Sequence, residues 1–243
     1  MLLTIDEGNT LIKIAVFEQN TLIRKEEISY LNFKELLKYF LDQFPTIENI
    51  IVSSVAQLQK NDFEELSEVI KVYYVSRETR FPFENVYTTP HTLGVDRMIL
   101  AAGAVLKFPD RNRLVIDAGT CITYDFIDAN NKYYGGAISP GINLRYKSLH
   151  DYTAKLPLLA LESPQQLIGN STSQSIHSGV VHGVVAEIDA FINAILNKND
   201  NFIIILTGGD ALFLAERLKN TIFANPNFLL ESLNLIFQFN YND

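Results

Sequence analysis

The sequence predicts an α/β protein built from two similar halves that share one cleft. Three observations carry this prediction. An apolar strand near the start of the chain ends in the turn Asp6-x-Gly8, and a second strand ends in Asp117-x-Gly119, a little under half the chain later. After each turn the apolar residues first alternate, as in strands, and then recur at helical spacing. A duplicated order of elements therefore organises the chain.

Length and composition are those of a globular protein. The chain has 243 residues, enough for one large domain or two of about 120. Its single cysteine, Cys121, excludes an internal disulfide and fits a reducing compartment. A net charge of −8 without a basic cluster disfavours nucleic acid, and the longest apolar stretch, 98–106, is too short to span a membrane. The run before Asp6 is also too short for a signal peptide. We expect a cytoplasmic protein without nucleic-acid or membrane partners.

The first half starts with three strands and continues with alternating helices and strands. The strands lie near 2–6, 11–18 and 21–29. The later elements are a helix at 33–44, a strand at 50–53, a helix near 61–70, a strand at 72–75 and a helix through 101–106. Pro45 ends the first of these helices. This order is typical of a ribonuclease-H-like domain.

The second half repeats that order. Its predicted elements are strands at 113–117, 121–127 and 132–138, a helix from about 142, a long helix from 172 to about 196, a strand at 202–206 and a helix from 212. The predicted domains are therefore two ribonuclease-H-like units, 1–110 and 111–243.

Both Asp-x-Gly turns have the chemistry to bind phosphate. An Asp at a strand end can hold a hydrated divalent cation, and the turn's backbone N–H groups, with the hydroxyl of Thr10 or Thr120, can hold anionic oxygens. A single such turn would be read as an ordinary hairpin. Its repetition, with a third glycine turn at 208–209 between a strand and a helix, favours an actin-like nucleotide cleft. Walker and Gly-x-Gly-x-x-Gly sequences are absent.

Four further features leave alternatives open. Lys13, the one charge in its apolar strand, either reaches the surface or meets an anion. Arg97, beside Asp96 in the first turn of a helix, opposes the helix dipole, so either Asp96 or a ligand offsets its charge. The glycines of 135–141 indicate either a plain turn or close approach of a ligand or backbone. Small residues at 175, 179 and 183 predict that the long helix packs closely on the sheet or on a second copy of the chain.

The motifs resemble, in order and over nearly the whole chain, those of the type III pantothenate kinases of the acetate and sugar kinase/Hsp70/actin superfamily. They are Asp6-x-Gly8-Asn9-Thr10, Tyr87-x-x-Pro90-x-x-Leu93-Gly94-x-Asp96-Arg97, Asp117-x-Gly119-Thr120, Gly135-Gly136-x-Ile138-x-Pro140-Gly141, Thr172 followed by Ser178-Gly179, and Gly208-Gly209-Asp210-Ala211. The Tyr87 to Arg97 block is the most specific. Glu7, Cys121 and Asn170 depart from the family pattern, and Glu7 is expected to add negative charge beside the phosphates.

The resemblance implies an enzyme that transfers the γ-phosphoryl group of ATP to pantothenate, giving 4'-phosphopantothenate in the first step of coenzyme A synthesis. Asp96 would be the catalytic base. Potassium or ammonium would bind at Asp117, and Mg²⁺ near Asp6 through water. The residues implied for ATP are Asp6, Glu7, Gly8, Asn9, Thr10, Leu11, Ile12, Lys13 and Thr120, to which the third glycine turn adds Gly208 and Gly209. Those implied for pantothenate are Tyr87, Gly94, Val95, Asp96, Arg97 and Thr172, the last from the other subunit of a homodimer.

Two alternatives compete with this interpretation. Another small-molecule kinase of the superfamily would keep both hairpins but would have no reason for the Tyr87 to Arg97 block. A regulatory, transcription accessory protein that binds ATP without kinase activity is the alternative from another class. The intact carboxylates Asp6, Asp96 and Asp117 argue against it.

Overall fold

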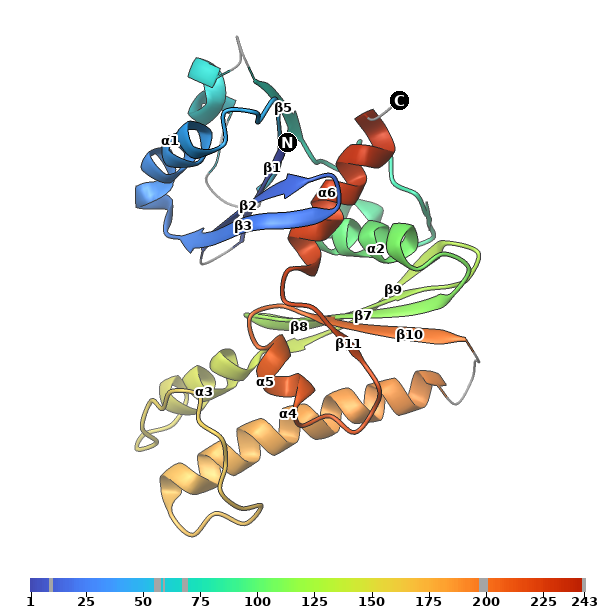
Figure 1. Ribbon diagram of the computed structural model, residues 1–243. Coiled ribbons are helices and arrows are strands. Elements are labelled where there is room, and N and C mark those ends of the chain that lie inside the picture. Colours follow the sequence, from blue (N-terminus) through green and yellow to red (C-terminus); the bar gives the residue numbers. More distant parts are fainter. Residues whose placement is uncertain (9–10, 55–57, 59, 67–69, 197–200, 242–243) are drawn as a thin grey trace. The chain divides into compact units, whose positions relative to one another are not determined.

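The computed structural model describes residues 1–243 except 9–10, 55–57, 59, 67–69, 197–200 and 242–243. The chain forms two compact units, coloured along the sequence in Figure 1. The first comprises 1–84, 88–107 and 227–243, and the second comprises 85–87 and 108–226. Each unit is a sheet with helices, so the predicted mixed α/β class is confirmed.

The first unit contains a five-stranded sheet in the order β3-β2-β1-β4-β5. Its strands are β1 (Leu2–Glu7), β2 (Ile12–Glu18), β3 (Thr21–Ile28), β4 (Asn49–Ser54) and β5 (Lys71–Tyr74). Its helices are α1 (Phe33–Gln43), α2 (Val95–Lys107) and α6 (Phe228–Tyr241), with 3-10 turns at Tyr30–Asn32, Lys60–Leu66 and Pro90–Thr92. The β1–β2 and β2–β3 pairs are antiparallel, whereas β1–β4 and β4–β5 are parallel.

Strand alternation decides which helix covers which face of this sheet. Leu3 and Ile5 of β1 belong to a core with α1, whereas Leu2 of the same strand belongs to a second core with α2 and α6. Because successive side chains point to opposite faces, one strand serves both cores. α1 therefore covers one face, and α2 with α6 covers the other (Figure 1).

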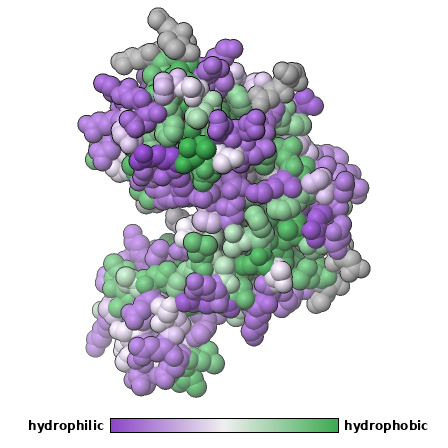
Figure 2. All heavy atoms as spheres, in the orientation of Figure 1, coloured by the Kyte–Doolittle hydropathy of each residue, from purple (hydrophilic) through white to green (hydrophobic). Residues whose placement is uncertain are grey.

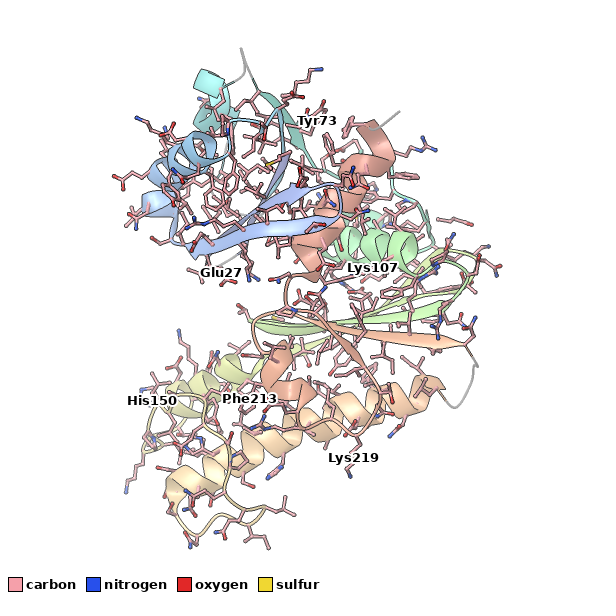
Figure 3. All side chains as sticks on the ribbon, viewed as in Figure 1. Glu27, Tyr73, Lys107, His150, Phe213 and Lys219 are labelled. Atoms are coloured by element: carbon pink, nitrogen blue, oxygen red, sulfur yellow. The ribbon has the colours of Figure 1, made fainter. Side chains whose placement is uncertain are left out.

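α6 packs on α2 and β1 of the first unit although it is the last helix of the chain. A Cβ atom at Gly103 would overlap with Ser232, so the two helices approach closely at this glycine. Lys107 Nζ pairs with Glu231 Oε2 at 2.6 Å, and the Tyr73 ring lies 5.3 Å from that of Phe237 (Figure 3). Sequence reasoning did not predict α6. The compact units differ from the predicted halves 1–110 and 111–243 in the segment 227–243 that contains α6, and also in residues 85–87 and 108–110.

The second unit contains a six-stranded sheet in the order β11-β10-β7-β8-β9-β6. Its strands are β6 (Glu84–Asn85), β7 (Asn112–Ala118), β8 (Cys121–Ile127), β9 (Lys132–Pro140), β10 (Phe202–Thr207) and β11 (Phe223–Ala224). Its helices are α3 (Ile142–Asp151), α4 (Thr172–Leu196) and α5 (Ala211–Ala215). Side chains of β7, β8 and β10 form one core with these three helices.

Most predicted elements are present within a few residues of the predicted bounds. One prediction is wrong: the helix expected near 61–70 is a 3-10 helix, Lys60–Leu66. Phe63 of this 3-10 helix is buried, and the centroid of its ring lies 5.6 Å from that of Phe33. Leu66 packs against the same core. Residues three apart eclipse in a 3-10 helix, so this short turn already brings both side chains to the core.

Candidate active site

The second hairpin is held from both sides by glycine backbone. It joins β7 to β8 through Gly119 and Thr120, and Gly119 N donates to Cys121 O at 3.0 Å. On one side Gly141 N donates to Thr120 O at 3.0 Å, and a Cβ at Gly141 would overlap with both carbonyl oxygens of the turn. The hairpin therefore needs a residue without a side chain at 141.

Gly208 contacts the other side of this hairpin. Its φ of 95° is in the region that glycine adopts most readily, and a Cβ there would overlap with Asp117 Oδ1 and Ala118 O. Asp210 N donates to Ala118 O at 3.0 Å, and burial raises the pKa of the Asp210 carboxyl. The structure thus brings together Asp117 and Gly208, two of the predicted site residues, and Thr120 lies in the same turn.

The first hairpin places three charged residues side by side across its strands. Asp6 pairs with Lys13 on β2, and Lys13 pairs in turn with Glu27 on β3. Directly opposite residues of antiparallel strands point to the same face, so Lys13 lies between two carboxylates. The pKa of the Glu27 carboxyl is lowered, mainly by the hydrogen bond from Lys25, although burial acts in the opposite direction. The charge of Lys13 adds to this lowering. The protein itself therefore provides anions for Lys13.

Glu7 points to the opposite face of the sheet from Asp6. Its side chain is buried, and Oε2 accepts hydrogen bonds of 2.7 Å from both Ser54 Oγ and Leu58 N. The carboxylate is thus bonded to the last residue of β4 and to the segment after it, which differs from the expectation that it adds charge beside the phosphates. Gly8 N donates to Leu11 O at 3.1 Å, and the predicted Asn9 and Thr10 lie outside the described residues.

The first turn of α2 carries the predicted base. Asp96 is half-buried, its Oδ1 accepts a 2.8 Å hydrogen bond from Arg97 N, and it lies so close to Gly94 that a Cβ there would overlap with it. Arg97 is buried, with 7% of its surface exposed. A carboxylate in the first turn is stabilised by the helix dipole. Gly94, Asp96 and Arg97 therefore form one compact group.

Tyr87 lies beside β9 in the second unit. Val86 N donates to Tyr133 O at 3.1 Å, and the Tyr87 ring lies against Gly135, whose φ is 89°. Gly135 follows an irregularity in the β8–β9 pairing and admits an aromatic ring, which the sequence did not suggest. The close approach of another backbone, one of the alternatives predicted for 135–141, is found at Gly136 and Gly141.

Sequence reasoning missed a buried pair that includes Tyr133, whose ring centroid is 6.3 Å from that of Tyr87. Tyr133 OH donates to Asp125 Oδ1 at 2.5 Å, and neither residue is exposed. The sequence does contain a signal for this pair, because Asp125 is the one charged residue in a largely apolar strand.

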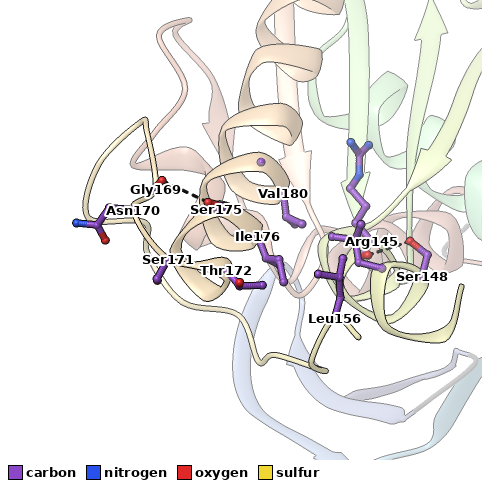
Figure 4. A pocket seen from close by; sticks show the side chains of 12 residues that line it. Arg145, Ser148, Leu156, Gly169, Asn170, Ser171, Thr172, Ser175, Ile176 and Val180 are labelled. Carbon is purple, nitrogen blue, oxygen red and sulfur yellow. Dashed lines mark hydrogen bonds between the residues drawn. The ribbon is translucent and has the colours of Figure 1, made fainter. Parts of the chain in front are cut away.

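Thr172 is exposed at the start of α4 and lines a pocket of about 980 Å³ (Figure 4). The other lining residues are Arg145, Ser148, Leu149, Leu156, Gly169, Asn170, Ser171, Ser175, Ile176, Gly179 and Val180. The apolar side chains of Leu167 and Ile168, which shortly precede α4 in the chain, are exposed. Figure 2 shows apolar surface, in green, at the lower end of the view.

One side of α4 has open space next to it. A Cβ at Gly179 or Gly183 would meet no atom within 4 Å, whereas Val180, Val184 and Ile188 are in the core. Of the two predicted packing partners for these glycines, the chain's own sheet is therefore excluded. By length and composition alone α4 could cross a membrane, but a core helix of a soluble protein passes the same test.

Comparison with known proteins gives the family. The type III pantothenate kinase model matches residues 2–194. A type III pantothenate kinase of Flavobacterium psychrophilum is 59% identical over 239 residues, which cover 98% of this chain and 99% of the relative. One from Bacteroides fragilis is 37% identical over 243 residues, covering 99% of this chain and 98% of the relative.

The chain belongs to the type III pantothenate kinase family. The family predicted from the motifs is confirmed. As a member of this family the chain is a kinase that phosphorylates pantothenate in coenzyme A synthesis, with ATP as the phosphoryl donor.

Solved structures confirm the fold. A Campylobacter jejuni protein named for the Baf family of transcriptional activators has a TM-score of 0.66 and 22% identity, covering 99% of this chain and 100% of that one. Component A of (R)-2-hydroxyglutaryl-CoA dehydratase from Acidaminococcus fermentans has a TM-score of 0.54 and 13% identity, covering 99% and 97%. At these identities the likeness concerns the fold alone, and it supports the predicted two-domain fold of the actin-like ATPases.

Proposed function

We propose that Asp96 is the catalytic base of this pantothenate kinase. Asp96 orients the terminal hydroxyl of pantothenate and accepts its proton while the oxygen attacks the γ-phosphorus of ATP. The observation that carries this proposal is its position: a half-buried carboxylate in the first turn of α2, between Gly94 and the buried Arg97. Phosphoryl transfer proceeds through a loose transition state, so positioning matters more than base strength and a carboxylate suffices.

The proposed ATP site uses both hairpins and the third glycine turn of two proposed ribonuclease-H-like domains, 1–110 and 111–243. Its residues are Asp6 to Lys13, Thr120, Gly208 and Gly209; Glu7 would take part through its backbone, because its side chain is bonded to Ser54 and Leu58. The close packing of Gly141 and Gly208 on the second hairpin supports this, because a turn that is fixed before the ligand arrives loses less entropy on binding. In this site the Thr120 hydroxyl and turn N–H groups donate to phosphate oxygens.

Two cations belong to this proposal. Asp117 Oδ1 and Ala118 O both lie against Gly208, and two neighbouring oxygens suit a monovalent cation, potassium or ammonium. Among the described residues no group of three His, Cys, Asp or Glu side chains could hold a metal. That fits Mg²⁺ held near Asp6 through water, since this ion keeps several waters and binds substrate phosphates. Bound there, Mg²⁺ would neutralise phosphate charge.

Pantothenate is proposed to contact Tyr87, residues 94–97 and Thr172 of the partner subunit in a homodimer. The exposed position of Thr172 and the open space beside Gly179 and Gly183 support an α4-mediated dimer. Small residues allow two helices to approach closely. We further propose a cytoplasmic enzyme with no nucleic-acid or membrane partner, in keeping with its net charge of −8.

A coupled ADP-release assay tests this function. Purified protein with ATP, Mg²⁺ and potassium should release ADP only when pantothenate is present, with an equal amount of phosphopantothenate formed. ADP release that responds instead to another small alcohol would indicate a different substrate. ATP binding with no turnover for any alcohol would favour the regulatory alternative.

A further inference from the structure

Glu187 of α4 accepts hydrogen bonds from three elements of the second unit. Tyr124 OH on β8 donates to Oε1 at 3.0 Å, and Ser139 Oγ on β9 donates to the same oxygen at 2.5 Å. Arg145 Nη2 on α3 donates to Oε2 at 2.6 Å, as an ion pair whose two side chains are each less than one third exposed. One carboxylate thus connects α4 to β8, β9 and α3.

Glu187 and its ion-pair partner Arg145 together fix the end of β9. Ser139 is held by its hydroxyl, and Arg145 Nε donates to the carbonyl of the next residue, Pro140, at 2.8 Å. Glu187 therefore holds the last two residues of β9, one directly and one through Arg145. A charged group at the centre makes these hydrogen bonds stronger than neutral ones.

The residue after this anchored pair is Gly141, which packs on the second hairpin. Its N–H donates to Thr120 O, and its backbone lies against Gly119. Pro140 also pairs with Cys121 across the β8–β9 ladder. The position of the turn at 119–120 is thereby linked through bonded neighbours to the carboxylate of Glu187.

We propose that Glu187 is a positioning residue that holds the Asp117–Thr120 hairpin, through Ser139, Arg145 and Gly141, in the geometry that binds ATP. This inference rests on the proposed role of Thr120 in ATP binding. Glu187 acts through other residues. Its removal should therefore raise the KM for ATP more than it changes the KM for pantothenate.

The ionisation of Glu187 is consistent with this role. Burial raises the pKa of its carboxyl, but the hydrogen bonds from Arg145, Ser139 and Tyr124 together lower the pKa by more. The net pKa is therefore below the ordinary value. Burial beside this carboxylate raises the pKa of Tyr124, which stays a neutral donor. At neutral pH the carboxylate is therefore charged and can hold Arg145.

The test compares Glu187→Gln with Asp189→Asn. Asp189 is a buried carboxylate on the same helix, but it accepts from Asn220 Nδ2 at 2.8 Å and Lys219 N at 3.2 Å, so it is a matched control outside the hairpin network. In Glu187→Gln we expect the KM for ATP to rise roughly fivefold to tenfold, the size of change that the loss of one ordinary hydrogen bond produces. Amide hydrogen exchange in 117–123 should also quicken. Asp189→Asn should lower Tm and leave both readouts unchanged.

Two further variants keep the result interpretable. Ser139→Ala removes one bond and should shift the same readouts less, which covers the case in which Glu187→Gln does not fold. Thr120→Ala tests the proposed ATP contact itself. A normal KM for ATP in Thr120→Ala would overturn that contact. Two results would overturn the positioning role. The first is unchanged amide hydrogen exchange in 117–123 of Glu187→Gln. The second is a normal KM for ATP in Glu187→Gln when Thr120→Ala has a raised KM for ATP.

Discussion

The ring of Tyr87 lies directly on Gly135, at a backbone φ of 89° where any side chain would overlap with the ring. Two motifs that are far apart in the sequence therefore meet at one contact. The first belongs to the block proposed for pantothenate, and the second had no assigned partner. Gly135 thus determines where the Tyr87 ring lies.

The first prediction concerns this contact. Gly135→Ala should raise the KM for pantothenate severalfold and leave the KM for ATP unchanged, because the new methyl group displaces the ring. It should also destabilise the protein by about 1 kcal/mol or more, since alanine is strained at positive φ. A double-mutant cycle checks this mechanism: the KM for pantothenate is measured by steady-state kinetics in Tyr87→Leu, in Gly135→Ala and in the double variant. Additive effects on KM would show that Gly135 acts independently of Tyr87.

The second prediction concerns Asp96. Asp96→Asn should lower turnover by roughly two orders of magnitude or more, because the acceptor of the hydroxyl proton is lost. Stability should change by about 1 kcal/mol or less, since asparagine can still accept the hydrogen bond from Arg97 N. Turnover is measured beside ATP affinity and Tm. Near-normal turnover would leave Asp96 with only its role at the helix terminus.

The third prediction concerns the monovalent cation at Asp117. Activity should fall sharply when potassium and ammonium are replaced by sodium, and Asp117→Ala should remove the response to potassium. Initial rates over a potassium series at constant ionic strength measure this. Equal activity in sodium would mean that Asp117 serves the hairpin structure or Mg²⁺.

The fourth prediction concerns the partner subunit. Thr172→Ala and Asp96→Asn should each be weakly active, and a mixture should regain part of the activity, because one site of a mixed dimer combines both intact residues. Subunit exchange is verified with a tagged chain. Complete exchange without recovery would place Thr172 in its own chain's site.

The fifth prediction follows from the lowered pKa of Glu187. A carboxyl whose pKa is lower in the folded than in the unfolded state stabilises the protein at pH values above the ordinary Glu pKa. This contribution is lost as the pH falls through the pKa of the folded state. The Tm difference between the wild type and Glu187→Gln should therefore be greatest near neutral pH and shrink below about pH 4. Thermal melts from pH 7 to pH 3 test this. A difference independent of pH would mean that the charge of Glu187 does not matter.

The sequence by itself determined most of the local structure and the family. Strand and helix positions follow from periodicity within short windows, and the turns follow from glycine and proline, so these predictions need no knowledge of distant contacts. The ordered motifs were sufficient to name the type III pantothenate kinases.

Only the tertiary structure decided which distant residues act together. It placed α6 in the first unit, bonded the Glu7 carboxylate to Ser54 and Leu58, and set the Tyr87 ring on Gly135. It also connected Glu187 to the second hairpin through β9. Each of these depends on packing between segments that are far apart in the chain. Periodicity shows which face of an element is apolar, but it does not show which segment will cover that face.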